Sequence, residues 1–460
     1  MNRSDPEWFE DTQISDPSAK VIAMPTRDKK SDDVSDDALA LEFASKHVDH
    51  LRWVNMWSRW MVFDGTVWRK DETLRAWDLV RVLCRGHGSR QAKTVAAVER
   101  MAHSDRFLAA TVEQWDIDPD LLNTPSGMID LKSGSRCAHD PQRYCTKITA
   151  VAPEGKCPLW LQFLSEVTDD DPELILYLQR LCGYGLTGNT REHALFFLYG
   201  TGANGKSVFL NTVSGIVGGY HRTAPIETFT ATHTDRHPTE LAMLQGARLV
   251  TAIETEEGRA WAESKIKSMT GGDSVSARFM RQDFFEFIPT FKLIVAGNHK
   301  PRLNAVDEAI RRRMNLIPFT VTIPQENRDP HLSEKLKAEW PGILHWMIEG
   351  CLIWQEQGLN PPAVVRNATA EYLASEDAFE QWLEDCCQEQ EFGFEKNSDL
   401  FQNWQGWASA HGEESGTQKR LVDKLETRFA RKRQPGTGQR GFDGIRLIRK
   451  NYADDQHFGG

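Results

Sequence analysis

The feature that most constrains the fold is an apolar run that leads directly into a glycine-rich loop. Residues 194–199 read ALFFLY, typical of a buried strand, and residues 208–213 read VFLNTV, typical of the start of a helix. The loop between them fits GxxxxGK[ST] and consists of Gly200, Thr201, Gly202, Ala203, Asn204, Gly205, Lys206 and Ser207. A strand, a phosphate-wrapping loop and a helix in this order predict an α/β fold with a parallel sheet.

The same loop predicts a site for a nucleoside triphosphate. Glycines allow successive backbone N–H groups to point at phosphates, Lys206 supplies a positive charge to the β- and γ-phosphates, and Ser207 supplies a hydroxyl ligand to Mg²⁺. The alternative is a chance match in a surface turn. The flanking strand and helix favour the nucleotide site, so ATP and Mg²⁺ are the expected cofactors.

Composition excludes several classes of protein. The chain has 460 residues, of which 26% are charged, and no apolar run approaches the length of about 20 residues that a membrane span requires. The eight cysteines are scattered without CxxC pairs, which predicts a reducing, cytoplasmic location and no zinc ribbon. A formal charge of -11 predicts that any contact with DNA is local.

Changes in composition divide the chain into segments. Residues 1–38 are polar and acidic and predict a disordered tail. Residues 39–190, with crowded tryptophans and the turn signal Asp64-Gly65, predict a small N-terminal α/β accessory domain. Residues 191–325 alternate strand and helix patterns and form the expected core, residues 326–390 are helical, and residues 396–450 form a last unit.

Carboxylates are expected at the sheet edge that carries the loop. Residues 248–253 predict a strand that ends in Glu254, Thr255, Glu256 and Glu257. Glu254 is the predicted metal-side carboxylate, and Glu256 is the predicted base that orients the attacking water, with Glu257 as the alternate. The alternative interpretation is a solvated acidic loop.

A second strand-like run, residues 291–297, ends at Asn298. A neutral amide beside the γ-phosphate suits hydrogen bonding to the attacking water, although an isolated Asn after a strand is usually a turn residue. Arg311, Arg312 and Arg313 follow. A guanidinium from this group would neutralise transition-state charge at a neighbouring subunit's site, and the alternative is a solvated charged face.

In order and spacing, these motifs resemble superfamily III helicases, and within them the phage and plasmid primase-helicase family that includes the poxvirus-type primase-helicases. The resemblance rests on Gly200–Ser207 and on RLVTAIETEEG (248–258), KSMTGGDSVSAR (267–278), PTFKLIVAGNHKP (289–301) and DEAIRRRMNLIPF (307–319). Upstream, residues 122–131 (LNTPSGMIDL) look like the family's domain before the helicase core.

The resemblance implies an AAA+-like P-loop ATPase core in a homo-hexameric ring that moves 3′-to-5′ on single-stranded DNA. By the family pattern the nucleotide site consists of Lys206, Ser207, Glu254 and Asn298, and Arg313 is the arginine finger with Arg312 as runner-up. Many superfamily III proteins have adjacent acids at the strand end. Here Thr255 separates Glu254 from Glu256, which leaves the identity of the base open.

The family also predicts a pore hairpin between the acidic strand and Asn298. Residues 274–280 and 284–288 alternate as two strands around a turn at 281–283. Lys267, Arg278 and Arg281 are the candidate DNA contacts, since basic side chains grip phosphates without regard to sequence. The alternative is an ordinary surface hairpin.

Basic residues outnumber acids within residues 416–450. A helix over 421–433 followed by a glycine-rich wing and a strand predicts a winged-helix DNA-binding module in 396–450, with Arg431, Lys432 and Arg433 as DNA contacts. The alternative is a solvated basic helix packed on the ring.

The expected function is that of an ATP-dependent DNA helicase for replication of a phage, plasmid or other mobile element. It would act on single-stranded and forked DNA with a primase, polymerase or origin-binding partner. Two alternatives stay open: a DNA-binding initiator ATPase without processive unwinding, and an NTP-driven protein-remodelling ATPase. Primer synthesis is not expected, because the acid pair in residues 116–118 is interpreted as a loop before a helix.

Overall fold

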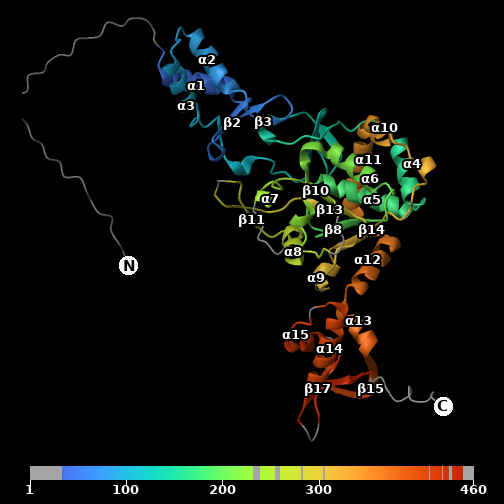
Figure 1. Cartoon of the computed structure of the whole chain (residues 1–460). Coiled ribbons are helices and arrows are strands. Elements are labelled where there is room, and N and C mark those ends of the chain that lie inside the picture. The colour runs from blue at the N-terminus through green and yellow to red at the C-terminus, as the bar shows by residue number, and fades with distance from the viewer. Residues whose placement is uncertain are drawn as a thin grey trace, which may run out of the picture. The chain divides into compact units, whose positions relative to one another are not determined.

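The computed structural model describes residues 34–231, 239–253, 259–280, 283–303, 306–413, 415–426, 428–434 and 438–448. The chain divides into two compact units, and Glu72–Ala109 belong with the residues up to Val48 in the smaller one. That unit contains three helices, α1 (Asp36–His47), α2 (Arg75–Gly86) and α3 (Ala92–Ala102) (Figure 1). Helix α1 begins inside the expected disordered tail because Ser35 caps it, accepting a hydrogen bond from the N–H of Ala38.

The tryptophan-rich segment forms a small antiparallel sheet of order β3-β2-β1-β4. Its strands are β1 (Leu51–Val54), β2 (Arg59–Phe63), β3 (Trp68–Lys70) and β4 (Ala109–Ala110). The predicted turn at Asp64-Gly65 is confirmed: Asp64 Oδ1 accepts hydrogen bonds from the N–H groups of Thr66 and Val67, both at 2.9 Å, and Gly65 has φ +99°. Trp68 packs edge-to-face on Trp115, with ring centroids 5.6 Å apart.

A second antiparallel sheet consists of β5 (Leu121–Thr124), β6 (Gly127–Asp130) and β7 (Ser135–Cys137). The loop expected at residues 116–118 is present, but it leads into strand β5 and not into a helix. Residues 121–124 form a strand because they pair with β6 in a local hairpin, and the distant Arg248 guanidinium holds the carbonyl oxygens of Asp118 and Leu121 at 2.9 Å.

The larger unit is built on a five-stranded sheet of order β14-β8-β13-β10-β9. Every neighbouring pair in it is parallel, which confirms the predicted parallel α/β sheet. The strands are β8 (Leu195–Tyr199), β9 (His221–Thr223), β10 (Leu249–Ile253), β13 (Lys292–Gly297) and β14 (Met314–Pro318).

Helices cover both faces of this sheet (Figure 1). Because side chains alternate along a strand, Phe196 and Leu198 of β8 face one hydrophobic core, and Leu195 and Phe197 face the other. The first core is shared with α4 (Pro158–Val167), α5 (Pro172–Leu186), α6 (Lys206–Val217), α10 (Leu332–Ala338) and α11 (Trp340–Gln357). The second is shared with α8 (Glu263–Gly271), α9 (Glu308–Arg311) and α12 (Ala363–Ser375). The short helix α7 (Thr239–Ala242) precedes β10 in the sequence. None of the helices that the structure describes is long and apolar enough to cross a bilayer.

The C-terminal part follows the order α13 (Ala378–Cys386), β15 (Cys387–Lys396), α14 (Asn397–His411), α15 (Gln418–Leu425), β16 (Ala430–Arg433) and β17 (Arg440–Leu447). The three strands form one sheet of order β15-β17-β16. The helix expected over 421–433 ends at Leu425, because residues 430–433 pair with β17. Helix α13 and strand β15, which precede the expected boundary at 396, share the core of this module through Trp382 and Cys387.

Helices α5 and α11 approach each other at two glycines. A Cβ on Gly183 would lie 2.1 Å from the backbone N of Cys351, and a Cβ on Gly350 would lie 2.1 Å from the carbonyl O of Gln179. Both distances are far shorter than any real contact, so the helix backbones can pack this closely only because neither residue has a side chain.

Gly350→Ala is therefore expected to lower the free energy of unfolding by about 1–3 kcal/mol, because the added methyl group must push α5 and α11 apart. The measurement is denaturant unfolding followed by circular dichroism. Gly406→Ala is the matched control: a Cβ on Gly406 of α14 meets nothing within 4 Å, so this change should stabilise the helix by about 0.5–1 kcal/mol. Equal effects of the two substitutions would contradict the close approach.

Candidate nucleotide site and DNA-contacting residues

The glycine-rich loop connects β8 to α6 at the carboxyl edge of the parallel sheet. Its backbone passes through left-handed conformations at Gly202 (φ +107°), Ala203 (φ +51°) and Gly205 (φ +82°). A Cβ on Gly205 would lie 2.6 Å from Cγ1 of Val167 and 2.9 Å from Cε2 of Phe163, both on α4. A glycine is thus required at position 205, because its φ is positive and because α4 leaves no room for a side chain.

Lys206 begins α6, and its side chain returns over the loop. Its Nζ donates to the carbonyl O of Gly200 (2.8 Å), to Oδ1 of Asn204 (3.1 Å) and to Oδ1 of Asn298 (3.2 Å). The residue is 7% exposed, and burial lowers the pKa of its ammonium group. These three acceptors, which are those among the described residues, are neutral and do not compensate the positive charge, so the site suits an anion such as a phosphate.

Asn298 reaches the loop because of strand register. In the parallel pair β8 and β13, Gly297 lies opposite Tyr199, so Asn298 leaves its strand at the same level as Gly200 leaves β8. The structure therefore brings together the loop lysine and the amide that the sequence analysis selected. The role of that amide in water positioning stays a prediction.

Strand β10 ends at Ile253, opposite Ala296 of β13 and so at the same edge of the sheet. The acids that follow, Glu254, Glu256 and Glu257, lie outside the described residues, and their roles stay predictions. Ser207 is exposed in the first turn of α6. A hydroxyl and a carboxylate are oxygen ligands of the kind that Mg²⁺ prefers, so the expected donor set fits this ion.

The three consecutive arginines have different surroundings. Arg311 forms an ion pair within the chain. Arg313 is 6% exposed: its Nε donates to Oγ1 of Thr270 (3.1 Å), its Nη1 donates to the carbonyl O of Ala309 (2.8 Å), and burial lowers its pKa. These contacts hold the Arg313 guanidinium within the chain, and the role of Arg313 as a finger stays a prediction. Arg312, the alternative finger residue, is exposed.

The predicted hairpin is confirmed. Strands β11 (Val275–Ala277) and β12 (Phe285–Phe287) pair antiparallel, with Val275 opposite Phe287. Beyond the paired residues, large apolar side chains are exposed, among them Met280 (73%) and Phe284 (60%). A hairpin that presents apolar side chains to solvent is suited to contact another molecule.

The three basic residues predicted to contact DNA around this hairpin differ in whether other groups of the chain already hold their charges. Lys267 forms an ion pair with Asp307 of the same chain. The Arg278 guanidinium lies 4.7 Å from the ring centroid of Phe284, which keeps it on the hairpin. Arg281 lies outside the described residues. Arg278 is therefore the candidate that the described geometry favours.

In the C-terminal module, Arg431, Lys432 and Arg433 lie on strand β16 and not on a helix. Arg431 pairs with Glu426 (2.7 Å) and Lys432 pairs with Asp443 (2.9 Å), so part of their charge is compensated. A groove of about 660 Å³ lies between α14, α15 and the β16–β17 hairpin. It is lined by the cations Lys396, Lys419, Arg431 and Arg440 and by the acids Asp399 and Asp423.

The sequence pattern alone does not single out Lys396, Lys419 or Arg440 as DNA contacts. These residues lie on three elements that are far apart in sequence, β15, α15 and β17. A count of basic residues along the chain marks the region but does not show which of them line one groove. The pairing of β15 with β17 and the position of α15 beside them bring these residues to one groove.

Two family models match parts of the chain. Residues 40–169 match the family described as "D5 N terminal like", and residues 198–313 match a family of unknown function (DUF5906). The first match extends through α4, and the second contains the glycine-rich loop, Asn298 and the three arginines.

Three viral proteins designated "Putative helicase" are similar in sequence. Protein L207/L206 of Acanthamoeba polyphaga mimivirus is 26% identical over 292 residues, which are 58% of this chain and 30% of that protein. Protein 022R of Frog virus 3 (isolate Goorha) is 26% identical over 313 residues, 62% and 31% of the two chains. Protein 184R of Invertebrate iridescent virus 6 is 25% identical over 266 residues, 55% and 27%. The matched part thus spans less than a third of each of these relatives.

Solved structures share the fold. The apo structure of the NrS-1 C terminal region superposes with a TM-score of 0.54 at 11% identity, covering 90% of this chain and 100% of that one. Its A form gives a TM-score of 0.52 at 11% identity, with 89% and 99% covered. The chain is thus similar in part to the D5 N terminal like family and to viral proteins named as helicases, and it shares the fold of the NrS-1 C terminal region.

Proposed function

We propose that this chain is the ATP-hydrolysing motor of a DNA helicase that replicates a phage, plasmid or other mobile element. The observation that carries the proposal is the contact between Lys206 Nζ and Asn298 Oδ1, 3.2 Å apart, beside the glycine-rich loop. It joins a phosphate-binding group and a water-positioning group at the sheet edge where α/β proteins bind ligands. The helicase-named relatives support DNA as the substrate.

The proposed chemistry is transfer of the γ-phosphoryl group of ATP to water. Lys206 would bind the β- and γ-phosphate oxygens, and Ser207 and Glu254 would hold Mg²⁺, which neutralises phosphate charge when bound. Glu256, with Glu257 as the alternate, would orient the attacking water and accept its proton, while Asn298 would donate a hydrogen bond to that water.

By its resemblance to superfamily III, the chain would assemble into an AAA+-like homo-hexameric ring that translocates 3′-to-5′ on single-stranded DNA. Arg312, which is exposed where Arg313 is buried, supports an arginine supplied to the neighbouring site. Arg278 and the exposed apolar residues of the β11–β12 hairpin support a pore element that grips DNA without regard to sequence.

A winged-helix DNA-binding module is proposed for the C-terminal part, beginning at α13 and not at residue 396. The order α13-β15-α14-α15-β16-β17 and the basic groove beside α15 support it. Helix α15 would enter the major groove while the β16–β17 hairpin contacts the backbone. This module would then recognise the DNA sequence, and the ring would generate the force.

One assay separates the candidate functions. ATP-dependent displacement of a strand from a 3′-tailed duplex supports the motor. Binding to duplex DNA without unwinding would favour an initiator ATPase, an alternative that the basic groove also suits. Nucleotide-dependent oligomers without DNA-stimulated hydrolysis would favour a protein-remodelling ATPase.

Lys206→Ala is expected to lower the ATP hydrolysis rate by about 10²-fold or more, because it removes the charge that stabilises the transferring phosphoryl group. Phosphate release is the measurement, with thermal unfolding as a check on the fold. Lys93→Ala, at an exposed position of α3, is the matched control and should keep wild-type activity. Full hydrolysis by Lys206→Ala would remove the proposed nucleotide site.

Arg312→Ala and Arg313→Ala are expected to differ. Arg312→Ala should lower kcat by about 10³-fold or more with little change in thermal stability, since an arginine finger acts on transition-state charge. Arg313→Ala should lower the free energy of unfolding by about 1.5–3 kcal/mol, because the substitution removes its buried hydrogen bonds to Thr270 and Ala309.

Mixing two inactive variants tests whether the arginine acts at a neighbouring subunit's site. Inactive Arg312→Ala protein combined with inactive Lys206→Ala protein should recover some ATPase, because a mixed ring contains interfaces with an intact lysine and an intact arginine. No recovery at any ratio, in assemblies shown to exchange subunits, would argue against an arginine supplied by a neighbour.

Combined Lys419→Glu and Arg440→Glu substitutions are expected to weaken binding to duplex DNA and to flatten its salt dependence. The log–log slope should fall by about 0.9 for each DNA phosphate that the variant no longer neutralises. Fluorescence anisotropy across a salt series measures both effects. Combined Arg90→Glu and Lys93→Glu substitutions introduce the same charge change at exposed positions of the other unit and should leave the slope unchanged. Identical slopes in the two variants would withdraw the winged-helix proposal.

A further inference from the structure

A cavity of about 310 Å³ lies at the amino edge of the parallel sheet, away from the glycine-rich loop. Three of its lining residues immediately precede or lead into strands: Tyr220 before β9, Arg248 before β10 and Thr290 before β13. In contrast, Gly200 and Asn298 follow their strands at the carboxyl edge. In a parallel sheet these are opposite edges, so the cavity is separate from the nucleotide site.

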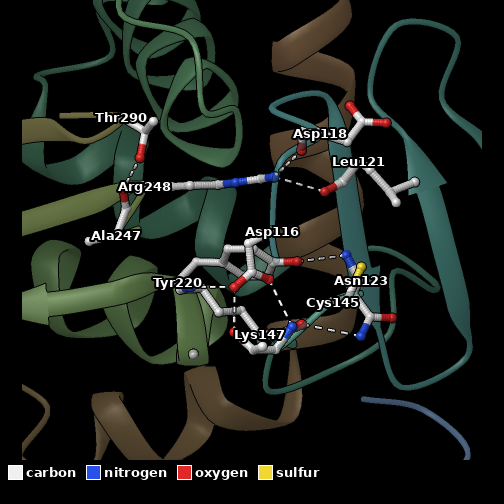
Figure 2. Close-up of polar contacts among 12 residues, drawn as sticks. Asp116, Asp118, Leu121, Asn123, Cys145, Lys147, Tyr220, Ala247, Arg248 and Thr290 are labelled. Atoms are coloured by element: carbon white, nitrogen blue, oxygen red, sulfur yellow. Dashed lines mark hydrogen bonds and ion pairs between the residues drawn. The ribbon is translucent and has the colours of Figure 1, made fainter. Parts of the chain in front are cut away.

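The wall of the cavity is built around Arg248 (Figure 2). Its Nη1 donates to the carbonyl O of Leu186 (2.7 Å), and its Nη2 donates to the carbonyl oxygens of Asp118 and Leu121 (2.9 Å each). The guanidinium also lies 4.5 Å from the ring centroid of Tyr220. Since its donors are used within the chain, Arg248 fixes the wall and offers little to an anionic ligand.

Asp116 is held in a strained conformation in the same wall. It has φ +54°, and its carboxylate accepts hydrogen bonds from the N–H of Thr146 (2.8 Å) and from Nζ of Lys147 (2.7 Å) (Figure 2). A Cβ on Gly246 would lie 2.9 Å from Lys147 Nζ, so the glycine makes room for the ammonium. The carboxylate and the ammonium compensate each other, and strain of this kind often marks a binding site.

The rest of the lining is aromatic or apolar. The rings of Trp57 and Trp115 lie 5.7 Å apart by centroid, and Trp57 is half-buried. Ile117 (69% exposed) and Ile288 (62% exposed) also line the cavity and present apolar surface to solvent. Ile288 directly follows β12, the return strand of the hairpin.

These features define the chemistry of the ligand. A cavity with compensated charges suits a neutral group better than a phosphate, and a partly exposed indole offers a flat face for stacking. The volume is at the lower end of the range of about 300–1,000 Å³ for small-ligand pockets. A single nucleobase with part of its sugar meets these conditions.

We propose that this cavity binds one unpaired nucleobase of single-stranded DNA, beside the hairpin that contacts the backbone. The proposal rests on the proposed DNA-motor function, since it assumes that single-stranded DNA is the substrate. Trp57 stacks on the base, the apolar rim formed by Ile117 and Ile288 excludes water around it, and Gln245, exposed at the edge, supplies an amide to its polar atoms.

The test is fluorescence anisotropy with labelled oligo(dT) and with an abasic oligonucleotide of the same length. Trp57→Ala should weaken binding of oligo(dT) by about 5- to 150-fold, the range for removal of one base–aromatic stack, and should leave binding of the abasic strand unchanged.

Trp57→Phe retains a stacking face and should recover most of the affinity. ATP hydrolysis without DNA should stay at the wild-type rate in both variants. Met56→Ala, at a neighbouring position that is 80% exposed and outside the cavity lining, is the matched control.

A second pair of variants keeps the test independent of the packing of Trp57. Ile117→Glu introduces a negative charge at the rim and should weaken DNA binding, whereas Met56→Glu introduces the same charge outside the cavity and should have a smaller effect. Equal effects of these two substitutions would count against the proposal, as would an equal loss of affinity by Trp57→Ala for the oligo(dT) and abasic strands.

The outcomes also separate this inference from the proposed function. If the wild-type protein binds oligo(dT) and Trp57→Ala binds it equally well, the base cavity is wrong and the motor proposal stands. If the wild-type protein neither binds oligo(dT) nor shows DNA-stimulated hydrolysis, both are wrong. A larger loss of affinity for oligo(dT) than for the abasic strand, without a fall in basal hydrolysis, supports both.

Discussion

The parallel pairing of β8 with β13 and β14 is the interaction on which the rest of the larger unit depends. β8 lies between the two strands, and its side chains are buried on both faces, with Phe196 and Leu198 on one and Leu195 and Phe197 on the other. A shift by one residue would exchange the two faces and misfit both cores, so the register is strongly determined. That register fixes where each strand ends, and with it the positions of the loop and of Asn298.

The loop is shaped by its neighbours as much as by its own glycines. Nδ2 of Asn204 donates to the carbonyl O of Phe319 (2.7 Å), and a Cβ on Gly200 would lie 2.0 Å from that same oxygen. On the other side, α4 leaves no room for a side chain at Gly205. Helix α4 lies within the segment that matches the D5 N terminal like family, so that segment packs directly against the glycine-rich loop.

Exposure and pairing decide which cations are available to a ligand. Arg313 and Lys267 satisfy their charges or hydrogen bonds within the chain, whereas among the described residues Lys206 has neutral acceptors, and Arg312 is exposed. A cation that is already paired gains little from a phosphate, because the existing pair must first be broken. This difference separates basic residues that stabilise the fold from those that suit DNA or nucleotide.

Local patterns in the sequence determined the strand, glycine-rich loop and helix at residues 194–213, the turn at Asp64-Gly65 and the β11–β12 hairpin, because each depends on residues that are close along the chain. The alternation of strand and helix patterns also predicted a parallel sheet, although its strands pair across about 100 residues of sequence. Contacts between distant segments decided the rest. Residues 430–433 form a strand because β17 pairs with them, and Arg313 is buried because α8 supplies Thr270. The cavity beside Arg248 is likewise assembled from segments far apart in sequence. Burial and hydrogen-bond partners are properties of the packed chain, so no local pattern specifies them.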